Sequence, residues 1–286
     1  MTASDPAACA RLYETLARFA WWRRRWQRCA PGAGLEMRKR LLPPHGDGPA
    51  DGGAGFDAWL RALLPEHRGA RVLDVGCGFG ASLLRWLEAG AASGRGVTAS
   101  GFQANVAAAE AKRRGLGERA AFAVHDFAAA HGGPFHVAIA IEALGHAQDL
   151  GAVLASVRRA LAPGGHFVWV EDLLQQTAPG DAEVAELARR WSSPPLRDVG
   201  QARRLLGDAG LAVVREVDLT AQVDVAPPGR LHEIERRLHA WRALLPLPPA
   251  RRLLDAFLGG LALERLYARG LACYRVWVLR RAPEMP

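Results

Sequence analysis

Residues 71–80, RVLDVGCGFG, combine an apolar run with three glycines at alternate positions. Val72, Leu73 and Val75 suit a strand that is covered on both faces. The glycines permit a tight turn and let the backbone approach a ligand closely. The apolar stretch 81–87 that follows predicts a helix whose first N–H groups face the same cleft. The run therefore predicts a nucleotide-type pocket at the carboxyl end of a parallel strand.

The spacing of the glycines separates the kinds of nucleotide pocket. A dinucleotide fingerprint reads G-x-G-x-x-G, and an acid ends its second strand. Here Gly76, Gly78 and Gly80 give G-x-G-x-G, with Asp74 before them, and the next candidate strand, 95–98, ends without a carboxylate. No Gly-Lys-Ser/Thr follows, which disfavours a phosphate-binding loop. These departures argue against NAD.

Strands and helices alternate from residue 71 onward, which predicts an α/β fold with right-handed crossovers. We expect a doubly wound, Rossmann-like, seven-stranded and mostly parallel sheet. The candidate strands are 71–75, 95–98, 120–125, 135–141, 165–171, 211–217 and 273–279. The candidate helices of this core are 80–89, 102–114, 149–161 and 199–209.

Two further segments predict helices outside the sheet. Apolar and aromatic residues recur at helical spacing over 7–29, and an insertion over 226–270 is too long for a bare loop. Within the insertion, 231–244 and 253–267 have helical patterns. The expected division is an N-terminal helical lid segment over 1–66, a cofactor-binding core over 67–225, a helical cap over 226–270, and the last strand with a tail over 271–286.

The charge balance bears on possible partners. The formal net charge is +8, and 35 of the 37 basic residues are arginine because Lys39 and Lys112 are the only lysines. Abundant alanine, glycine and proline accompany the arginines, which indicates a GC-rich coding bias more than selection for phosphate contacts. The arginines are spread along the chain, beside acids. We therefore expect no nucleic-acid partner.

The cysteines and the apolar runs bear on class and location. Cys9, Cys29, Cys77 and Cys273 lack the spacing of a metal site, so we expect free thiols, no metal and no disulfide framework. No apolar run reaches the ~18 residues that a membrane-spanning helix needs. The N-terminus lacks the positive-then-apolar pattern of a signal peptide. These features predict a cytoplasmic protein without integral membrane association.

The run at 71–80 resembles motif I of the class I S-adenosylmethionine-dependent methyltransferases, and the resemblance extends over about residues 68–175. It implies S-adenosylmethionine as the cofactor. Its methionine part would then lie against the glycine turn, formed by Gly76, Cys77, Gly78 and Gly80. Asp74 would order that turn and attract the amino group of the cofactor.

The end of the second strand departs from the commonest pattern of that family, in which an acid binds the ribose. Residues 96–103, GVTASGFQ, are instead similar to the G-x-T-x-S-x-x-Q pattern of cyclopropane-fatty-acid synthases and of sterol and tocopherol C-methyltransferases. This resemblance implies neutral hydrogen bonds to the ribose from Thr98, Ser100 and Gln103. The alternative is an ordinary strand end in which Ser100 caps the next helix.

Two residues after the third strand are adenine-site candidates. In the family that this sequence resembles, an acid at this place contacts the adenine amino group. The corresponding residue here is Asp126. Phe127 would add a backbone N–H or an apolar wall. Asp126 could instead cap a helix.

The fourth strand leads into the candidate chemistry. Residues 141–147, IEALGHA, resemble a segment of the sterol C-methyltransferases and place Glu142 and His146 on the acceptor side. An oxygen or nitrogen acceptor needs a base, which His146 could supply. An alkene acceptor creates a carbocation, which the carboxylate of Glu142 could stabilise. Both residues could also be structural.

Aromatic side chains of the N-terminal helix are candidates for the acceptor pocket. Tyr13, Trp21 and Trp22 could wall an apolar cavity together with the cap, and Glu171, after the fifth strand, could position the acceptor. The same aromatics could instead be helix core, or a basic amphipathic surface that rests on a membrane.

These observations predict methyl transfer from S-adenosylmethionine to carbon or oxygen of a small, apolar, isoprenoid-like or polyketide-like metabolite. The alternatives are a non-catalytic binding protein with this fold and an RNA methyltransferase. Against the latter, EALG stands at 142–145, where such enzymes often carry Asn/Asp-Pro-Pro-Tyr/Phe. The expected partner is the small-molecule acceptor. Peripheral membrane contact remains open, and a monomer or a homodimer is expected.

Overall fold

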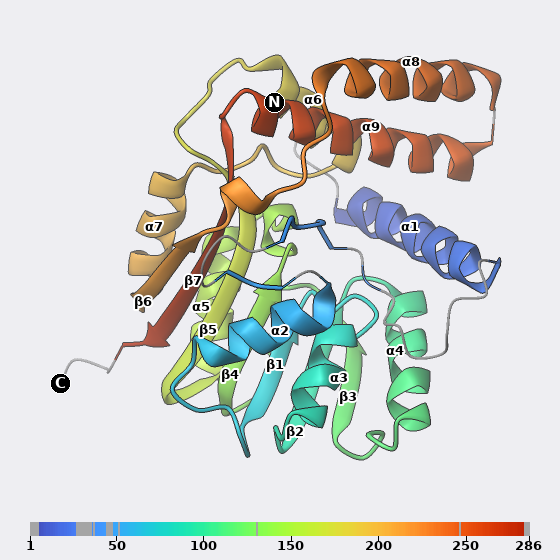
Figure 1. Cartoon of the computed structure of the whole chain (residues 1–286). Coiled ribbons are helices and arrows are strands. Elements are labelled where there is room, and N and C mark those ends of the chain that lie inside the picture. The colour runs from blue at the N-terminus through green and yellow to red at the C-terminus, as the bar shows by residue number, and fades with distance from the viewer. Residues whose placement is uncertain are drawn as a thin grey trace.

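A seven-stranded sheet forms the centre of the molecule, in the order β3-β2-β1-β4-β5-β7-β6 (Figure 1). The computed structural model describes residues 6–26, 36, 38–43, 48–50, 52–129, 131–245 and 247–282. Neighbouring strands pair in parallel, except that β7 runs antiparallel to both β5 and β6. The predicted doubly wound, mostly parallel sheet is confirmed. The strands are β1 (Arg71–Val75), β2 (Ser93–Thr98), β3 (Ala120–Val124), β4 (Phe135–Ile141), β5 (Leu161–Leu174), β6 (Leu211–Asp218) and β7 (Ala272–Arg281).

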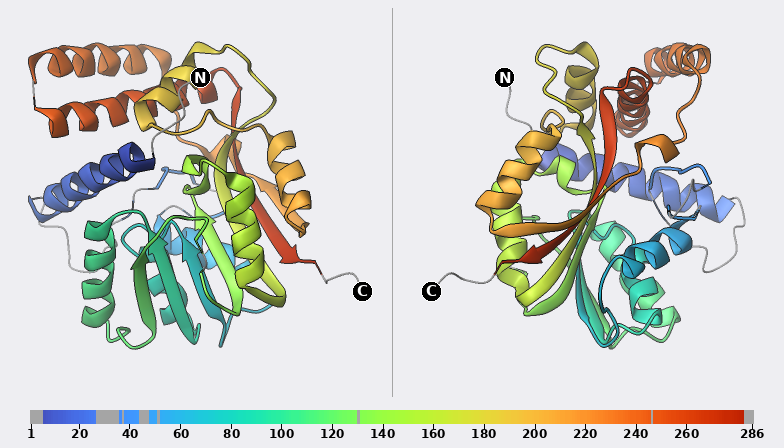
Figure 2. Two further views of the ribbon diagram at one scale, coloured as in Figure 1. Left: turned by 180° about the vertical axis from the view of Figure 1, so that it is seen from behind. Right: turned by 60° about the vertical axis from the view of Figure 1, so that its left-hand side comes forward.

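Helices cover both faces of the sheet (Figure 2). Phe56, Leu60 and Leu84 pack into the core on one face, and Leu154 and Leu206 pack on the other. Each fully buried side chain of this size stabilises the fold by about 2 kcal/mol. The helices are α1 (Pro6–Trp26), α2 (Gly53–Ala62), α3 (Ala81–Glu88), α4 (Gly101–Arg113), α5 (Leu150–Ala160), α6 (Ala182–Trp191), α7 (Val199–Asp208), α8 (Pro228–Leu244) and α9 (Pro248–Ala268), with short 3₁₀ turns η1 (Leu144–His146) and η2 (Thr220–Gln222).

The strand order reverses between β1 and β4, which places the candidate residues together. β1 lies between β2 and β4, and the chain leaves β1 toward one side of the sheet and enters β4 on the other. The carboxyl ends of neighbouring parallel strands at such a switch point bound a crevice. Asp74, Thr98 and Glu142 stand at or directly after the ends of β1, β2 and β4, so they share this edge.

Several elements differ from the sequence-based expectation. β5 is longer than predicted, and α8 and α9 each begin before their predicted starts. Helix α6 was not predicted, because Gly, Ser and Pro flank it closely; its start is marked by Asp181, whose side chain accepts from the N–H of Val184 at 3.3 Å. Predicted helical residues 27–29 lie outside the described residues. The proposed division of the chain into lid, core and cap stays a prediction.

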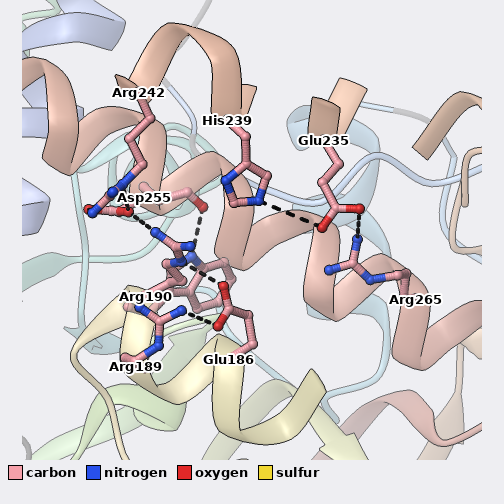
Figure 3. Close-up of polar contacts among 10 residues, drawn as sticks. Glu186, Arg189, Arg190, Glu235, His239, Arg242, Asp255 and Arg265 are labelled. Carbon is pink, nitrogen blue, oxygen red and sulfur yellow. Dashed lines mark hydrogen bonds and ion pairs between the residues drawn. The ribbon is translucent and has the colours of Figure 1, made fainter. Parts of the chain in front are cut away.

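Helices α6, α8 and α9 are joined by ion pairs, which Figure 3 shows in close-up. Asp255 of α9 pairs with Arg190 of α6 and with Arg242 of α8. The Arg190 side chain is only 7% exposed and also pairs with Glu186. On the far side of the cluster, Arg265 contacts Glu235 at 3.2 Å. These contacts hold the three helices as one layer over the end of the sheet. No helix in the described ranges is long and apolar enough to cross a membrane.

Asp255→Ala is expected to lower the free energy of unfolding by about 2 kcal/mol, because it leaves the buried guanidinium of Arg190 with one acid instead of two. Chemical denaturation followed by circular dichroism measures this change. Glu233→Ala is the matched control: it removes an exposed pair with Arg237 on α8, and its effect should stay within about 0.5 kcal/mol. Equal effects of the two substitutions would contradict a structural role for the cluster.

Candidate active site

A cavity of about 290 Å³ lies at the carboxyl edge of the sheet, under α1 and around the glycine turn after β1. Its wall contains most of the residues that the sequence singled out. These are Tyr13, Asp74, Gly76, Cys77, Gly78, Thr98, Gln103, Asp126, Phe127, Glu142 and His146. The structure thus brings most of the candidate cofactor residues and both candidate catalytic residues to one cavity.

The three glycines have different surroundings. A Cβ on Gly76 would lie 2.2 Å from the Cβ of Ala143, and one on Gly80 would lie 2.6 Å from the ring of Phe122. At Gly78 the φ angle is +52°, and a Cβ there would meet only the amide nitrogen of Gln103, at 3.9 Å. Gly76 and Gly80 are therefore required by close packing of the protein itself, whereas Gly78 faces the cavity.

Two charged side chains on the cavity wall have unpartnered atoms. Asp74 is 3% exposed, and its Oδ2 has no hydrogen-bond partner in the described structure. Burial and the neighbouring carboxylate of Asp57 raise the pKa of Asp74 to about 7. Arg38 donates from Nη2 to Ser82 at 2.7 Å, and its Nη1 is buried without a partner. The cavity thus carries an unsatisfied acceptor and an unsatisfied cationic donor.

Neutral side chains form the wall at the end of β2. Thr98 donates from Oγ1 to the side-chain oxygen of Gln103 at 2.7 Å, which leaves the Gln103 amide N–H groups on the side of Gly78. Ser100 caps α4: its Oγ accepts from the N–H of Gln103 at 3.1 Å and donates to the carboxylate of Glu14. Thr98 and Gln103 line the cavity, whereas Ser100 lies beneath α1 as a helix cap.

Asp126 and Phe127 follow β3 on the same edge. Oδ1 of Asp126 accepts from the N–H of Ala128 at 2.8 Å and so stabilises the turn. Both residues line the cavity, and Phe127 contributes an apolar surface close to Gly76. The hydrogen bond within the turn uses only one oxygen of the Asp126 carboxylate. The other oxygen can contact a ligand, so Asp126 can both stabilise the turn and bind a ligand.

Glu142 is held by a network of buried polar groups. It has a φ of +51°, which is unfavourable for any residue with a side chain. Its carboxylate accepts from the N–H of Lys39 at 3.1 Å and from the Tyr274 hydroxyl at 2.6 Å. The Lys39 ammonium lies 3.3 Å from Asp172. Burial raises the pKa of Glu142, and the lysine opposes this effect.

The same network determines the charge of Lys39. Burial acts to lower the pKa of Lys39, but the carboxylates of Asp172 and Glu142 outweigh it, so the pKa is raised. Tyr267 donates its hydroxyl to Asp172 as well. Lys39 therefore stays an ammonium ion between two carboxylates.

His146 lies where the N-terminal helix meets the cavity. The Tyr13 hydroxyl of α1 is hydrogen-bonded to Nε2 of His146, and the Trp191 ring lies 5.6 Å from the imidazole, centre to centre. Nδ1 of His146 is buried without a partner. Burial lowers the pKa of His146 to about 4, so the ring is neutral at physiological pH.

Five predicted residues lie away from the cavity wall. Gly80 and Ser100 have the packing and capping roles described above. Trp21 packs edge-on against Phe102, and Trp22 is 53% exposed. Glu171 is buried and accepts from the N–H of Gly145 at 2.8 Å; burial, with Asp172 nearby, raises its pKa to about 8.

Several residues of the site were not identified from the sequence. Arg38 and Lys39 are adjacent and precede the sheet, whereas Tyr274 lies in β7, more than a hundred residues later. No local sequence pattern relates these two segments. The rarity of lysine in this chain was the one sequence feature that could have singled out Lys39 as a functional candidate.

The sequence also predicted free thiols and no metal site. Cys77 and Cys273 are free, and the side chains of Cys9 and Cys29 lie outside the described part of the chain. Within that part, no three His, Cys, Asp or Glu side chains are grouped as metal ligands would be. The expectation of a metal-free reaction stays a prediction.

Comparison with solved structures shows which fold this is. The geranyl diphosphate C-methyltransferase from Streptomyces coelicolor, solved with Mg²⁺, geranyl diphosphate and S-adenosyl-L-homocysteine, matches with a TM-score of 0.65, 17% identity, and coverage of 95% of this chain and 98% of that one. The [4+2]-cyclase SpnF matches with a TM-score of 0.63 and 21% identity over 86% of this chain and 87% of that one. At these identities the likeness shows the fold alone.

Sequence comparison finds relatives that are named as C-methyltransferases and others that are named as O-methyltransferases. The 24-methylenesterol C-methyltransferase 2 of Oryza sativa subsp. japonica is 31% identical over 164 residues, 55% of this chain and 45% of the rice protein. The O-methyltransferase rstn1 of Aspergillus nomiae is 29% identical over 161 residues, 54% of this chain and 70% of that protein. The matched part spans about half the length of the sterol methyltransferase relatives, as for the Aspergillus fumigatus sterol 24-C-methyltransferase erg6 at 48%.

A family model described as a methyltransferase domain matches residues 53–216, more than half of the chain. The matched range runs from α2 to β6 and so contains β1, the glycine turn and most of the cavity wall. The chain therefore belongs to the methyltransferase domain family.

Proposed function

We propose that this protein transfers a methyl group from S-adenosylmethionine to oxygen or carbon of a small, apolar acceptor. One observation carries the proposal: a single cavity contains the glycine turn, the unpartnered carboxylate of Asp74 and a neutral His146. The names of the relatives, which include sterol C-methyltransferases and fungal O-methyltransferases, support both kinds of acceptor atom.

The cavity residues fit the proposed cofactor. The unpartnered Oδ2 of Asp74 suits the α-ammonium group of the methionine part, and the unpartnered Nη1 of Arg38 suits its carboxylate. Gln103 and Thr98 offer neutral hydrogen bonds for ribose hydroxyl groups. Phe127 supplies an apolar surface for adenine. Both unsatisfied buried atoms would gain a partner of opposite charge.

When bound, the cofactor supplies a methyl group that is already activated by its sulfonium centre. The protein's own task is then to align the acceptor and to exclude water. Helix α1 covers the cavity and is fixed there by the bond between Tyr13 and His146. The neutral imidazole would accept the proton of an acceptor hydroxyl, and Tyr13 would orient that ring.

Glu142 supports the carbon-acceptor version of the proposal. Lys39 and Tyr274 hold its carboxylate in place at the cavity wall. A fixed negative charge of this kind stabilises a carbocation that develops at an alkene acceptor. The Tyr13–His146 pair supports the oxygen version, because a hydroxyl acceptor needs a proton acceptor beside it.

The remaining predictions concern partners and location. We propose a small molecule, not a nucleic acid, as the partner, since many arginines are engaged by acids of their own helix, as Arg113 and Arg114 are by Glu110. We further propose a cytoplasmic monomer or homodimer.

The general proposal is tested by incubating the protein with methyl-labelled S-adenosylmethionine and a panel of isoprenoid and polyketide acceptors. Label in none of them, together with no cofactor binding, would contradict it.

Gly78→Val should abolish binding of S-adenosylmethionine, because the new side chain enters the cavity beside Gln103. Isothermal titration calorimetry measures the loss. Gly115→Val is the matched control: Gly115 has a φ of +71° and no atom near its Cβ position, so it carries the backbone strain without the obstruction. Near-normal cofactor affinity in a folded Gly78→Val variant would contradict the cofactor site.

The affinity for S-adenosylmethionine should rise as the pH increases through about 7, the pKa of Asp74 in the free protein. Below this pH the carboxyl is protonated and cannot pair with an ammonium group; above it the carboxylate can. Calorimetry from pH 6 to pH 8 measures the change. Asp74→Asn should bind more weakly and should flatten this dependence. An unchanged pH profile in that variant would contradict the role of Asp74.

His146→Ala should retain cofactor binding and lose at least about a hundredfold in turnover on a hydroxyl acceptor, the usual contribution of a general base. Tyr13→Phe should lose less, since the imidazole remains. Transfer of labelled methyl to the acceptor found in the panel measures both effects. If Glu142→Gln is the variant that loses turnover and His146→Ala is not, the acceptor atom is carbon and the oxygen version fails.

A further inference from the structure

The turn between α8 and α9 exposes a group of large apolar side chains. Trp241 is 58% exposed, Leu244 76%, Leu245 40% and Leu247 65%. We call these four residues the cap tip. Trp22 of α1 and Phe257 of α9 are exposed as well, at 53% and 44%. Among the ten large apolar residues exposed in the described ranges, six therefore come from α1 and the α8–α9 pair.

The cap tip lies at one end of the molecule. Figures 1 and 2 show that the α8–α9 connection and the C-terminal end of α1 extend to the same side, beyond the sheet. Phe19 of α1 contacts Phe257 of α9, with ring centres 6.2 Å apart, so the two parts form one continuous surface. Other apolar residues of α8, such as Ile234 and Leu238, pack inward against Leu258. The inner face of α8 is thus used for packing, whereas the Trp241 and Leu244 side chains at its C-terminal end are exposed.

Arginine is more frequent than acidic residues in the segments that form this apolar surface. Residues 228–257 contain six arginines and three acids, and α1 contains five arginines and one acid. On the exposed face of α8, Arg236 and Arg237 precede Trp241 by about one turn. The Arg236 side chain is exposed, and within the described part of the chain it has no ion-pair partner. The surface therefore combines apolar side chains with excess positive charge.

We propose that the cap tip and the adjoining end of α1 bind the surface of an anionic phospholipid bilayer. Tryptophan and leucine at a helix end insert at the boundary between headgroups and acyl chains, and flanking arginines pair with lipid phosphates. Each such arginine contributes about fivefold in affinity for an anionic membrane. A second copy of this chain is a poorer occupant, because it would bring the same excess of positive charge to the contact.

The location of this surface relates it to the reaction cavity. A second cavity, of about 630 Å³, lies between α1 and α9 and is lined in part by Phe19, Pro249 and Leu253. It shares the lining residues Ala10 and Ala99 with the cavity at the sheet edge. An apolar acceptor dissolved in the bilayer would enter the protein by this route. This consequence rests on the proposed function, whereas the membrane contact itself does not.

Vesicle flotation tests the contact without any assay of methyl transfer. The full chain is mixed with vesicles of phosphatidylcholine alone, or of phosphatidylcholine with an equal amount of phosphatidylglycerol, and centrifuged through a sucrose gradient. The protein should float with the anionic vesicles and remain at the bottom with the neutral ones. Raising the salt concentration from 0.05 to 0.5 M, on the order of a threefold shorter screening length, should weaken the binding.

Variants locate the contact on the surface. Trp241→Ser combined with Leu244→Ser should weaken vesicle binding at least about tenfold, and Arg236→Gln about fivefold. The matched controls are on β6: Val213→Ser with Val214→Ser, which are 41% and 59% exposed, and Arg215→Gln. These controls should bind vesicles as the unchanged protein does.

Three outcomes would overturn the proposal: no flotation with anionic vesicles, equal flotation with neutral ones, or unchanged flotation of the Trp241/Leu244 variant. Light scattering provides a further check on the same samples. A dimer that the Trp241/Leu244 substitutions convert to a monomer would show that the cap tip is a contact between copies, and this too would overturn the membrane assignment. Because cofactor binding is measured separately, failure here leaves the proposed function standing.

Discussion

A buried pair of carboxylates around one ammonium ion holds together the parts of the protein that enclose the cavity. The ammonium belongs to Lys39, and the carboxylates are those of Asp172, within β5, and Glu142, directly after β4. Glu142 has a φ of +51°, a conformation that costs about 1–3 kcal/mol and persists where surrounding contacts compensate for it. Here the N–H of Lys39 and the hydroxyl of Tyr274 supply those contacts.

This network extends from the sheet to the helices above it. Tyr267 of α9 donates its hydroxyl to Asp172, so helix α9 is joined to the same buried charges as Lys39. Removing one partner of a buried ion pair typically costs about 3–5 kcal/mol, because the other charge is left uncompensated. The positions of cap, N-terminal segment and sheet are therefore coupled at the edge of the cavity.

Local sequence signals were reliable where one segment supplies both the backbone geometry and the chemistry. The G-x-G-x-G turn after β1 is such a case, since Gly78 faces the cavity and Asp74 lies beside it. Signals were ambiguous where one residue type serves two purposes. Ser100 matched a ribose-binding pattern, but it caps α4 and contacts Glu14. Aromatic spacing in α1 could not separate Tyr13, which faces the cavity, from Trp22, which faces solvent, because both suit an amphipathic helix.

The sequence by itself determined the doubly wound sheet, the glycine turn, and the presence of Glu142 and His146 at the edge of the sheet that bounds the cavity. Hydrophobic periodicity and turn-forming residues are local, and the right-handed crossover rule converts their order into a topology. Only the tertiary structure decided which partners these residues have: Tyr13 for His146, and Lys39 and Tyr274 for Glu142. Those contacts join residues more than a hundred positions apart, and they depend on how the helices pack over the sheet. The charges of the cavity were decided in the same way, because burial and neighbouring groups, not residue type, determine the pKa values of Asp74 and His146.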